Sequence, residues 1–392
     1  MTSRAELTQL QQLPQLTQLT QLTQLTQNVP DCTLATACFC LHDKNEKALS
    51  VEQITEKIET LLSIPVYLVI YCDTQMHPII QRLRAPYDHL TVYKVTTLTD
   101  LWSFQYEEQV NKNRAISWPT RDERTGPESH LLTCNKPAFV LETIHQNPFN
   151  TSKFGWIDCF TGSNMNRIAQ HYTPNMLPYI LSNITDKYHI QVLNVCDKKY
   201  KNPENKRELY ERYRYIVCGG MFTCGREIGL RILPRLQEIF VEATDAGWGH
   251  GEEMLHLEIL DEFYDDIHRS YGDYGQILNN FIRPTQNLKY ISSHIFRQYF
   301  RLGYHKECYD CGNIVLDEIK SHRVSVDATT HFQFAFHFYV ATFYYKHHEA
   351  KAAAQYVIDI CRLHPSIRAE WDKNPGFYKD QLQYATEVPE GF

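Results

Sequence analysis

The chain has 392 residues and a formal net charge of −7, and 43% of its residues are hydrophobic and 12% aromatic. This length fits one large domain with a smaller one, and the composition is that of a globular protein. The net negative charge gives no support to a role in binding nucleic acid. No run of about 18 apolar residues predicts a membrane span. The first residues lack the pattern of a signal peptide, so we expect a cytoplasmic protein.

The twelve cysteines are scattered along the chain, and several stand inside apolar runs such as "ACFC" and "YIVC". This pattern predicts reduced thiols in the core rather than a disulfide framework. One Cys-x2-Cys pair occurs, Cys308 and Cys311, with His305 nearby. A structural zinc site usually takes four ligands, so this single pair does not favour zinc.

Residues 1–30 differ from the rest because "QLTQLTQLTQLTQ" repeats a three-residue unit. That period matches neither a helix nor a strand, and the segment has almost no charge and no aromatic residue. We predict a disordered low-complexity Gln/Leu/Thr tail. A short amphipathic helix used for self-association is the alternative.

Apolar runs and helical periodicities alternate after the tail. We expect strands at 33–41, 64–73 and 90–96, with helices at 49–63 and 77–85 between them. Ser50 and Gln53 have the spacing of a capping box at the start of the first helix. The alternation predicts a Rossmann-like α/β domain whose parallel sheet is covered by helices on both faces.

The middle of the chain continues the alternation. We expect a helix at 136–146, strands at 153–158 and 188–196, a charged helix, strand and glycine turn within 205–225, and a long helix at 226–247. Beyond about residue 290 helical patterns dominate. The segments 293–319 and 337–361 resemble each other, with the small residues Gly312 and Ala354 at matching positions. They predict stacked, tetratricopeptide-like helical hairpins that pack on the preceding domain.

Acidic residues stand where a ligand would bind in such a sheet. Asp73 ends "VIYCD", Asp158 ends "GWID", and Glu252 and Glu253 follow the loop "GWGHG". Ligands of open α/β sheets lie outside the carboxyl ends of the strands. Two acids at neighbouring strand ends can serve a nucleotide, one near the nucleoside and one holding Mg²⁺ or Mn²⁺ on a diphosphate. The alternative is that each acid caps a helix or stabilises a turn.

Glycine-rich stretches supply candidates for acceptor binding. Trp248 offers a stacking face for a sugar or base beside His250, and one of the two following glutamates is a candidate general base. The pair Gly219 and Gly220 would let an acceptor sugar lie against the backbone. Asp273 stands in a glycine-flanked turn of "YGDYG".

Taken together, these stretches resemble the HtrL/YibB-like (WlaTC-type) family, whose members resemble glycosyltransferases of the GT-A fold. The resemblance covers roughly residues 33–290 and is carried by "YLVIYCD", "NKPAFVLETIHQNPFNTSKFGWIDCF", "CGGMFTCG", "HGEEML" and "GDYGQILNNF". It implies transfer of a sugar from a nucleotide-sugar donor. It places Asp73 near the nucleoside, Lys136 near the donor and Asp158 on a metal, with Glu252 or Glu253 on the acceptor side.

Two features depart from the family pattern. The usual Asp-x-Asp is reduced to Trp156-Ile157-Asp158, which points to weak metal binding or to a metal-independent reaction. Cys159-Phe160-Thr161-Gly162 replaces the usual continuation after the acid, so the donor loop has its own shape.

We therefore predict a tail at 1–30, a GT-A-like domain at 31–290 and a helical region at 291–392. The predicted function is sugar transfer from a nucleotide-sugar to a hydroxyl acceptor on a glycan, lipid or protein, assisted by Mn²⁺ or Mg²⁺. The alternatives are a non-catalytic interaction module that binds a protein partner through the helical region, and a nucleotidyltransferase. The predicted site residues are Glu252 and Glu253 (catalytic), Asp73, Lys136, Trp156 and Asp158 (donor and metal), and Gly219, Gly220, Trp248, His250 and Asp273 (acceptor).

Overall fold

The computed structural model describes residues 29–116, 126–161, 176–210, 212–248, 251–272, 277–282, 291–321 and 326–367. Nearly all of the predicted tail lies outside these ranges. Within them the chain forms two compact units. The first holds described residues of 29–192, 199–270 and 277–282, and the second holds those of 193–198, 271–272 and 291–367. We describe each unit by itself.

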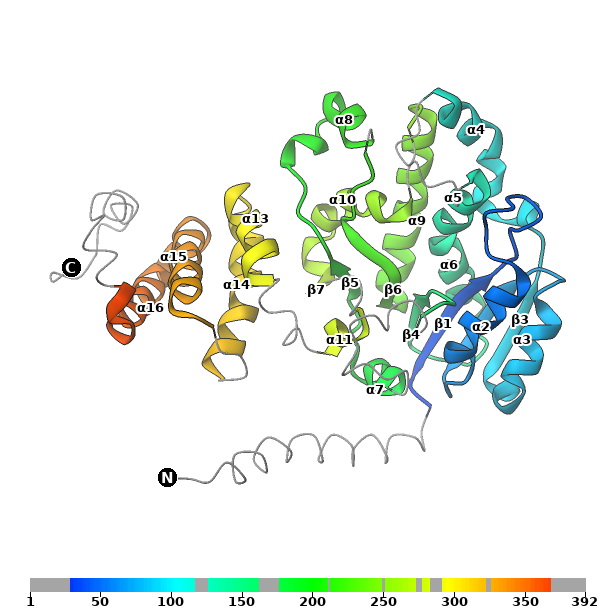
Figure 1. Ribbon diagram of the computed structural model, residues 1–392, viewed down its shortest axis with the longest axis horizontal. Coiled ribbons are helices and arrows are strands. Elements are labelled where there is room, and N and C mark those ends of the chain that lie inside the picture. Colours follow the sequence, from blue (N-terminus) through cyan, green and yellow to red (C-terminus); the bar gives the residue numbers. More distant parts are fainter. Residues whose placement is uncertain are drawn as a thin grey trace. The chain divides into compact units, whose positions relative to one another are not determined.

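The first unit begins with the predicted alternation of strands and helices (Figure 1). Its elements are β1 (Cys32–Cys38), α2 (Val51–Leu62), β2 (Tyr67–Cys72), α3 (His77–Arg84) and β3 (Thr91–Val95). The capping box at the start of α2 is confirmed, since Gln53 N–H donates to Ser50 Oγ and Ser50 N–H donates to Gln53 Oε1. Both strands β2 and β1 are buried along almost their whole length, as expected of parallel strands covered on two faces.

The sheet has seven strands in the order β3-β2-β1-β4-β6-β5-β7. β4 (Lys153–Ile157) lies parallel to β1, whereas β6 (Val217–Gly225) lies antiparallel to β4 and to β5 (Tyr188–Val192). The last strand is β7 (Ile267–Tyr271). The expectation of a purely parallel sheet is therefore wrong. A buried strand is an apolar run in either direction, so the sequence pattern carries no signal for its polarity.

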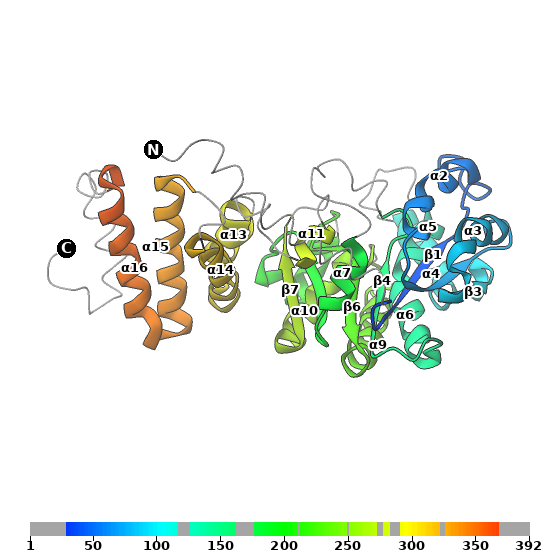
Figure 2. The same ribbon diagram turned by 90° about the horizontal axis from the view of Figure 1, so that it is seen from below.

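Helices cover both faces of this sheet. The remaining helices of the first unit are α4 (Glu107–Ile116), α5 (Pro127–Cys134), α6 (Lys136–Gln146), α7 (Met176–Asn183), α8 (Lys206–Tyr210), α9 (Arg226–Asp245), α10 (Glu252–Glu262) and α11 (Ile277–Ile282). Figure 2 shows α2, α7 and α11 on one side of the strands and α6, α9 and α10 on the other. The predicted cover on both faces is thus confirmed.

The strand order places a topological switch between β1 and β4. From β1 the chain proceeds to β2 and β3 on one side, and β4 then pairs with the other edge of β1. The loops that leave the carboxyl ends of two such strands turn in opposite directions, which opens a crevice where ligands of α/β proteins bind. Asp158 follows β4 directly and therefore lies at this crevice.

The predicted glycine turn after the strand of 205–225 is wrong. Gly219 and Gly220 lie within β6, and the strand continues to Gly225 before α9 begins. The strand continues past the two glycines because the residues that follow, such as the buried Phe222, pair with a neighbouring strand of the sheet. Packing within the sheet thus outweighs the low strand propensity of glycine.

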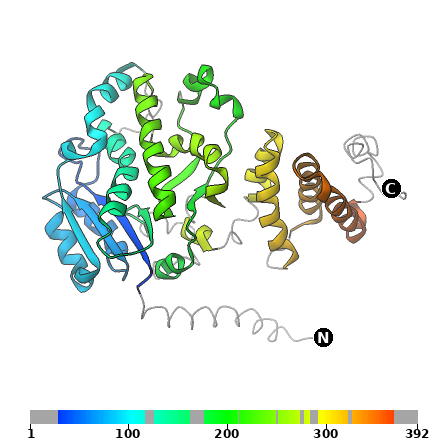
Figure 3. The ribbon, with the colours of Figure 1, turned by 180° about the vertical axis from the view of Figure 1, so that it is seen from behind.

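The second unit is helical. A single π-helical turn (Ile291–Ile295) leads into α13 (Phe296–Arg301), α14 (His305–Lys320), α15 (Ala328–Tyr345) and α16 (Ala350–Leu363). α15 packs against both α14 and α16, and Figure 3 shows the three helices side by side. A Cβ on Gly312 would lie 2.4 Å from a ring carbon of Phe338, so the small residue is required where α14 and α15 cross. The likeness to tetratricopeptide repeats stays a prediction.

All twelve cysteines are free thiols, and ten of them are buried. Cys308 and Cys311 lie on α14 inside the helical core. Burial raises the pKa of both thiols, which keeps them protonated at neutral pH. Across the described residues, no helix is long and apolar enough to span a membrane.

Candidate functional site

A buried ion cluster lies at the carboxyl end of β4 and is built on Lys136. Lys136 opens α6, next to Pro137 in the first helical turn, where a proline costs no backbone hydrogen bond. Its Nζ lies 2.5 Å from Glu252 Oε1 and 2.9 Å from Asp158 Oδ1. It also donates to the carbonyl oxygen of Gly219, at 3.0 Å. Three sequence-distant segments therefore meet on one ammonium group.

The charge of Lys136 is stabilised by its partners. The residue is only 5% exposed. Burial by itself lowers the pKa of Lys136, but the negative charges of Asp158 and Glu252 outweigh it, so the pKa is raised above its ordinary value. The ammonium group is therefore a fixed positive charge at neutral pH.

Asp158 is held in place by two donors. The indole Nε1–H of Trp156 donates to Asp158 Oδ1 at 2.6 Å, and Lys136 contacts the same oxygen. The backbone N–H of Asp158 donates to the carbonyl of Gly220 at 2.8 Å, which extends the pairing of β4 with β6. The Asp158 side chain is 29% exposed. Within the described part of the chain, its second oxygen, Oδ2, has no hydrogen-bond partner.

Trp156 lies behind Asp158 rather than at the surface. It is 3% exposed and stacks on Phe139 of α6 with a ring-centroid distance of 5.8 Å. Lys136 Nζ lies 5.5 Å from the centre of its ring. The indole therefore orients the Asp158 carboxylate through this hydrogen bond and has little exposed surface for contact with a ligand.

The two glutamates at the start of α10 have different environments. Glu252 pairs with Lys136, as described above. Glu253 Oε1 accepts from the backbone N–H of Gly219 at 3.1 Å, and its Oε2 accepts from the hydroxyl of Tyr213 at 2.7 Å. Burial and the neighbouring Glu252 raise the pKa of Glu253 to about 7. Its proton therefore exchanges near neutral pH, as required of a general base.

Gly219 is necessary for this arrangement of carboxylates. A Cβ at this position would lie 2.4 Å from Glu252 Oε1 and 3.2 Å from Glu253 Cγ. Its backbone already serves both acids, because its N–H donates to Glu253 while its carbonyl accepts from Lys136. The side of Gly219 that was predicted to contact an acceptor sugar is thus occupied by Glu252 and Glu253.

His256 and Tyr188 form a hydrogen-bonded chain that ends on the backbone of Glu252. His256 lies one turn after Glu252 and contacts the carbonyl oxygen of Glu252 through Nδ1, at 2.9 Å. A carbonyl oxygen can only accept, so Nδ1 carries the proton and Nε2 accepts from the Tyr188 hydroxyl, at 2.9 Å. Burial lowers the pKa of His256 to about 4, so the ring is neutral. Neither residue nor Tyr213 was predicted; the Glu252–His256 spacing of one helical turn was the available signal.

Asp73 lies apart from the cluster. Its carboxylate accepts from the backbone N–H of Cys40 and of Met76, each at 2.7 Å. It follows β2, and β1 lies between β2 and β4, so Asp73 and Asp158 do not end neighbouring strands. Because its two oxygens tie the loops after β1 and β2 together, Asp73 shapes the carboxyl edge of the sheet.

Of three further predicted acceptor residues, the structure describes Trp248 alone. The backbone of Trp248 is fixed by α9 and α4, since its N–H donates to Ala243 and its carbonyl accepts from the Asn113 side chain. His250 and Asp273 lie outside the described residues. Glu252 and Glu253 lie in the first turn of α10, directly after Gly251.

The described residues offer no group of three or more His, Cys, Asp or Glu side chains that would hold a metal by themselves. Asp158 Oδ2 can still contribute one oxygen ligand. Mg²⁺ and Mn²⁺ are commonly held by one or two carboxylates together with substrate phosphates and water. The cluster of one lysine and three acids also has an excess of negative charge, which would repel a diphosphate. These features fit a divalent cation that binds together with its nucleotide.

The comparisons with known proteins give little. The chain matches no protein-family model and no curated protein. Among solved structures, the apo form of mouse xyloside xylosyltransferase 1 is similar with a TM-score of 0.34 and 10% sequence identity, over 60% of this chain and 84% of that chain. A TM-score this low carries no argument about this chain, and the HtrL/YibB-like resemblance stays a prediction.

Proposed function

We propose that the first unit transfers a sugar from a nucleotide-sugar donor to a hydroxyl group of an acceptor. The observation that supports this most is the meeting of Lys136, Asp158 and the Glu252–Glu253 pair at the switch point of the sheet. With the exception of Asp73, the residues implied by the GT-A resemblance thereby lie in one place, although they are far apart in sequence.

Asp158 has the donor-side role in this proposal. The Oδ2 of this partly exposed side chain would hold Mn²⁺ or Mg²⁺, and the bound ion would supply positive charge to the diphosphate leaving group. Lys136 and Trp156 fix the other oxygen, Oδ1, so the carboxylate cannot rotate freely. A rigid carboxylate keeps its oxygen directed at the ligand position before the substrate arrives.

Glu253 is the general base in this proposal. The bond between the sugar and the diphosphate breaks, a bond forms from the acceptor oxygen to the sugar, and the hydroxyl proton passes to Glu253. Its pKa of about 7 lets it accept that proton at neutral pH and release it afterwards. Glu252 pairs with Lys136 instead, and its charge adds to the effect of burial in raising the pKa of Glu253.

Nucleotide binding tests the proposal. UDP, GDP and CMP are each added to the full chain with and without Mn²⁺, and the free energy of unfolding is compared between wild type and Asp158→Asn. A ligand at a hundred times its Kd stabilises the folded state by about 2.7 kcal/mol. We expect this gain for one nucleotide with Mn²⁺ in wild type and its loss in Asp158→Asn.

The matched control is Asp359→Asn on α16, which removes the charge of an aspartate that is 56% exposed. It should keep the full nucleotide response. The proposal is wrong if no nucleotide stabilises the wild type, or if Asp158→Asn and Asp359→Asn respond alike.

A further inference from the structure

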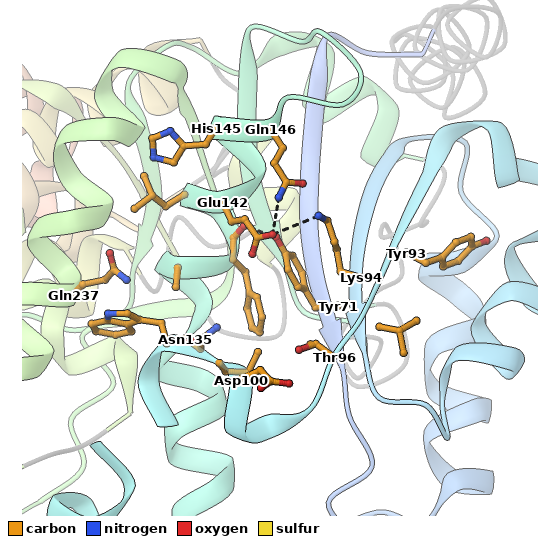
Figure 4. Close-up of a pocket in the computed structure, with 16 residues that line it drawn as sticks. Tyr71, Tyr93, Lys94, Thr96, Asp100, Asn135, Glu142, His145, Gln146 and Gln237 are labelled. Carbon is orange, nitrogen blue, oxygen red and sulfur yellow. Dashed lines mark hydrogen bonds and ion pairs between the residues drawn. The ribbon is translucent and has the colours of Figure 1, made fainter. Parts of the chain in front are cut away.

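A groove of about 770 Å³ lies beside the sheet edge, on the face covered by α6. Its floor is formed by Tyr71 and Lys94, which are register partners on β2 and β3 and so point to the same face. One stripe of α6 forms a wall, and its residues Asn135, Ala138, Glu142 and His145 repeat every three or four positions. Gln237 of α9 adds to the lining (Figure 4). Trp102, at the start of a 3-10 helix between β3 and α4, completes it.

The groove is distinct from the ion cluster. Lys136 leaves α6 toward β6 and α10, whereas the groove residues lie along another stripe of the same helix. None of the residues of the ion cluster lines the groove. Its volume is in the range of pockets that enclose small organic ligands, and no step proposed for Asp158 or Glu253 uses it.

The charges of the lining disfavour an anionic ligand. Lys94 is paired with Glu142 at 3.5 Å, and Glu142 also accepts from Gln146 at 2.7 Å. Asp100 adds another carboxylate to the lining. Apart from the imidazole of His145, Lys94 is the one basic side chain among the described residues that line the groove, so a phosphate or nucleotide would meet an excess of negative charge.

Several polar groups point at the groove without a partner in the described chain. Asn135 is 98% buried, and its Oδ1 accepts from the backbone N–H of Ser103 at 3.0 Å, while its Nδ2 has no hydrogen bond among the described residues. The side chains of Gln237 and His145 likewise make none within the described ranges. Each of these groups can therefore hydrogen-bond to a ligand in place of water.

An aromatic ring lies beside these polar groups. Trp102 is half-buried and fixed by Tyr106 and Phe240, with ring-centroid distances of 5.6 Å to each. A rigid indole gives a flat apolar surface at low entropic cost. Amides, carboxylates and one indole around this groove suit an uncharged ligand with many hydroxyl groups, each both donor and acceptor, and with apolar C–H faces.

We propose that this groove binds a neutral saccharide, with its sugar face on Trp102 and its hydroxyls on Asn135, Gln237 and the acids of the lining. The site stands on the groove alone and does not rest on sugar transfer at Asp158. If both proposals hold, the saccharide belongs to a glycan that the protein recognises away from the reacting centre.

The proposal is tested by titrating the full chain with neutral trisaccharides of glucose, galactose, N-acetylglucosamine and xylose. Binding is measured by saturation-transfer NMR and by calorimetry. We expect at least one to bind wild type at millimolar concentration or below. Gln237→Ala and Asn135→Asp should each weaken it about 3- to 10-fold, the effect of one lost hydrogen bond. Asn135→Asp keeps the oxygen that Ser103 needs and replaces the unpaired donor by a second carboxylate oxygen, which also adds a negative charge. Trp102→Ala should abolish detectable binding.

Glu238→Ala is the matched control, because Glu238 is the next residue of α9, is exposed, and contacts Arg235 outside the groove. It and Asp158→Asn should bind the trisaccharide as wild type does. Retention in Asp158→Asn separates this site from the proposed transfer site. The inference is overturned if no trisaccharide binds, or if binding is equal in Gln237→Ala and Glu238→Ala, or if it is lost in Asp158→Asn but kept in Trp102→Ala.

Discussion

Replacing Lys136 by methionine removes the positive charge on which the cluster depends while keeping a side chain of similar length. Asp158 and Glu252 would then face each other without a cation, and Glu252 is 6% exposed. Removing one partner of a buried ion pair costs about 3–5 kcal/mol, because the remaining charge stays desolvated. We expect Lys136→Met to lower the free energy of unfolding by that amount in urea titrations followed by tryptophan fluorescence.

Lys112→Met is the matched control. Lys112 pairs with Glu108 at 2.7 Å, but the two side chains are 61% and 86% exposed. An exposed helical pair of this spacing contributes about 0.5 kcal/mol or less. Adding Glu252→Gln to Lys136→Met should restore part of the lost stability, because the double variant buries one charge fewer. A loss below about 1 kcal/mol in Lys136→Met, equal to that in Lys112→Met, would refute the reasoning.

Three further outcomes follow from the geometry. The pKa of Glu253 is raised from an ordinary 4.5 to about 7, so between these pH values the folded state holds a proton that the unfolded state has lost. The stabilising contribution of Glu253 is therefore full below pH 4.5 and falls as the pH rises through 7. Between pH 5 and 8 wild type should lose about 2–3 kcal/mol more stability than Glu253→Gln in urea unfolding, and equal slopes would contradict the shift. Gly219→Ala should lower the free energy of unfolding by more than about 1 kcal/mol, as expected of an overpacked core site. Gly126→Ala should be tolerated, because its Cβ would meet only the ends of flexible side chains. The Tm of each variant, measured by calorimetry, distinguishes the two. A thiol reagent should label Cys40 and Cys159 rapidly in the native protein and the ten buried cysteines slowly, and mass spectrometry of tryptic peptides would show a different pattern if the core were open.

The strands and helices were predictable where local patterns decide them. Ser50 and Gln53 announce the start of α2, and the apolar runs around Leu34 and Val69 become buried parallel strands. The direction of β6 was not predictable, because pairing with β4 and β5 is a property of the whole sheet. For the same reason the sequence pattern predicts a turn at Gly219 and Gly220, although pairing with the neighbouring strands makes them part of β6.

The charged residues of the candidate site could be predicted from the sequence, but the residues that hydrogen-bond to them could not. Lys136, Asp158, Glu252 and Glu253 were all named from the sequence, and the structure brings them together. Tyr213 was missed because a tyrosine in a charged stretch gives no signal of the carboxylate that it will contact 40 residues later.

Arg84 shows the same limit in the core. It is 0% exposed and its guanidinium donates to the carbonyl oxygens of Leu62, Ile64 and Val66. Those acceptors are backbone atoms at the end of α2 and in the loop before β2, and they become available only after the chain has folded. A single arginine in an amphipathic helix would otherwise be assigned to the solvent-facing side.

The most direct test of the central claim is release of the nucleotide from its sugar conjugate. UDP-, GDP- and CMP-sugars are incubated with the full chain and Mn²⁺, and the freed nucleotide is measured by chromatography for wild type, Asp158→Asn and Glu253→Gln. We predict release from one donor class by wild type, and a loss of at least about 100-fold in each variant, the usual share of a general base or a charge stabiliser. No release from any donor, or equal release by all three proteins, would contradict a transfer site at Asp158 and Glu253.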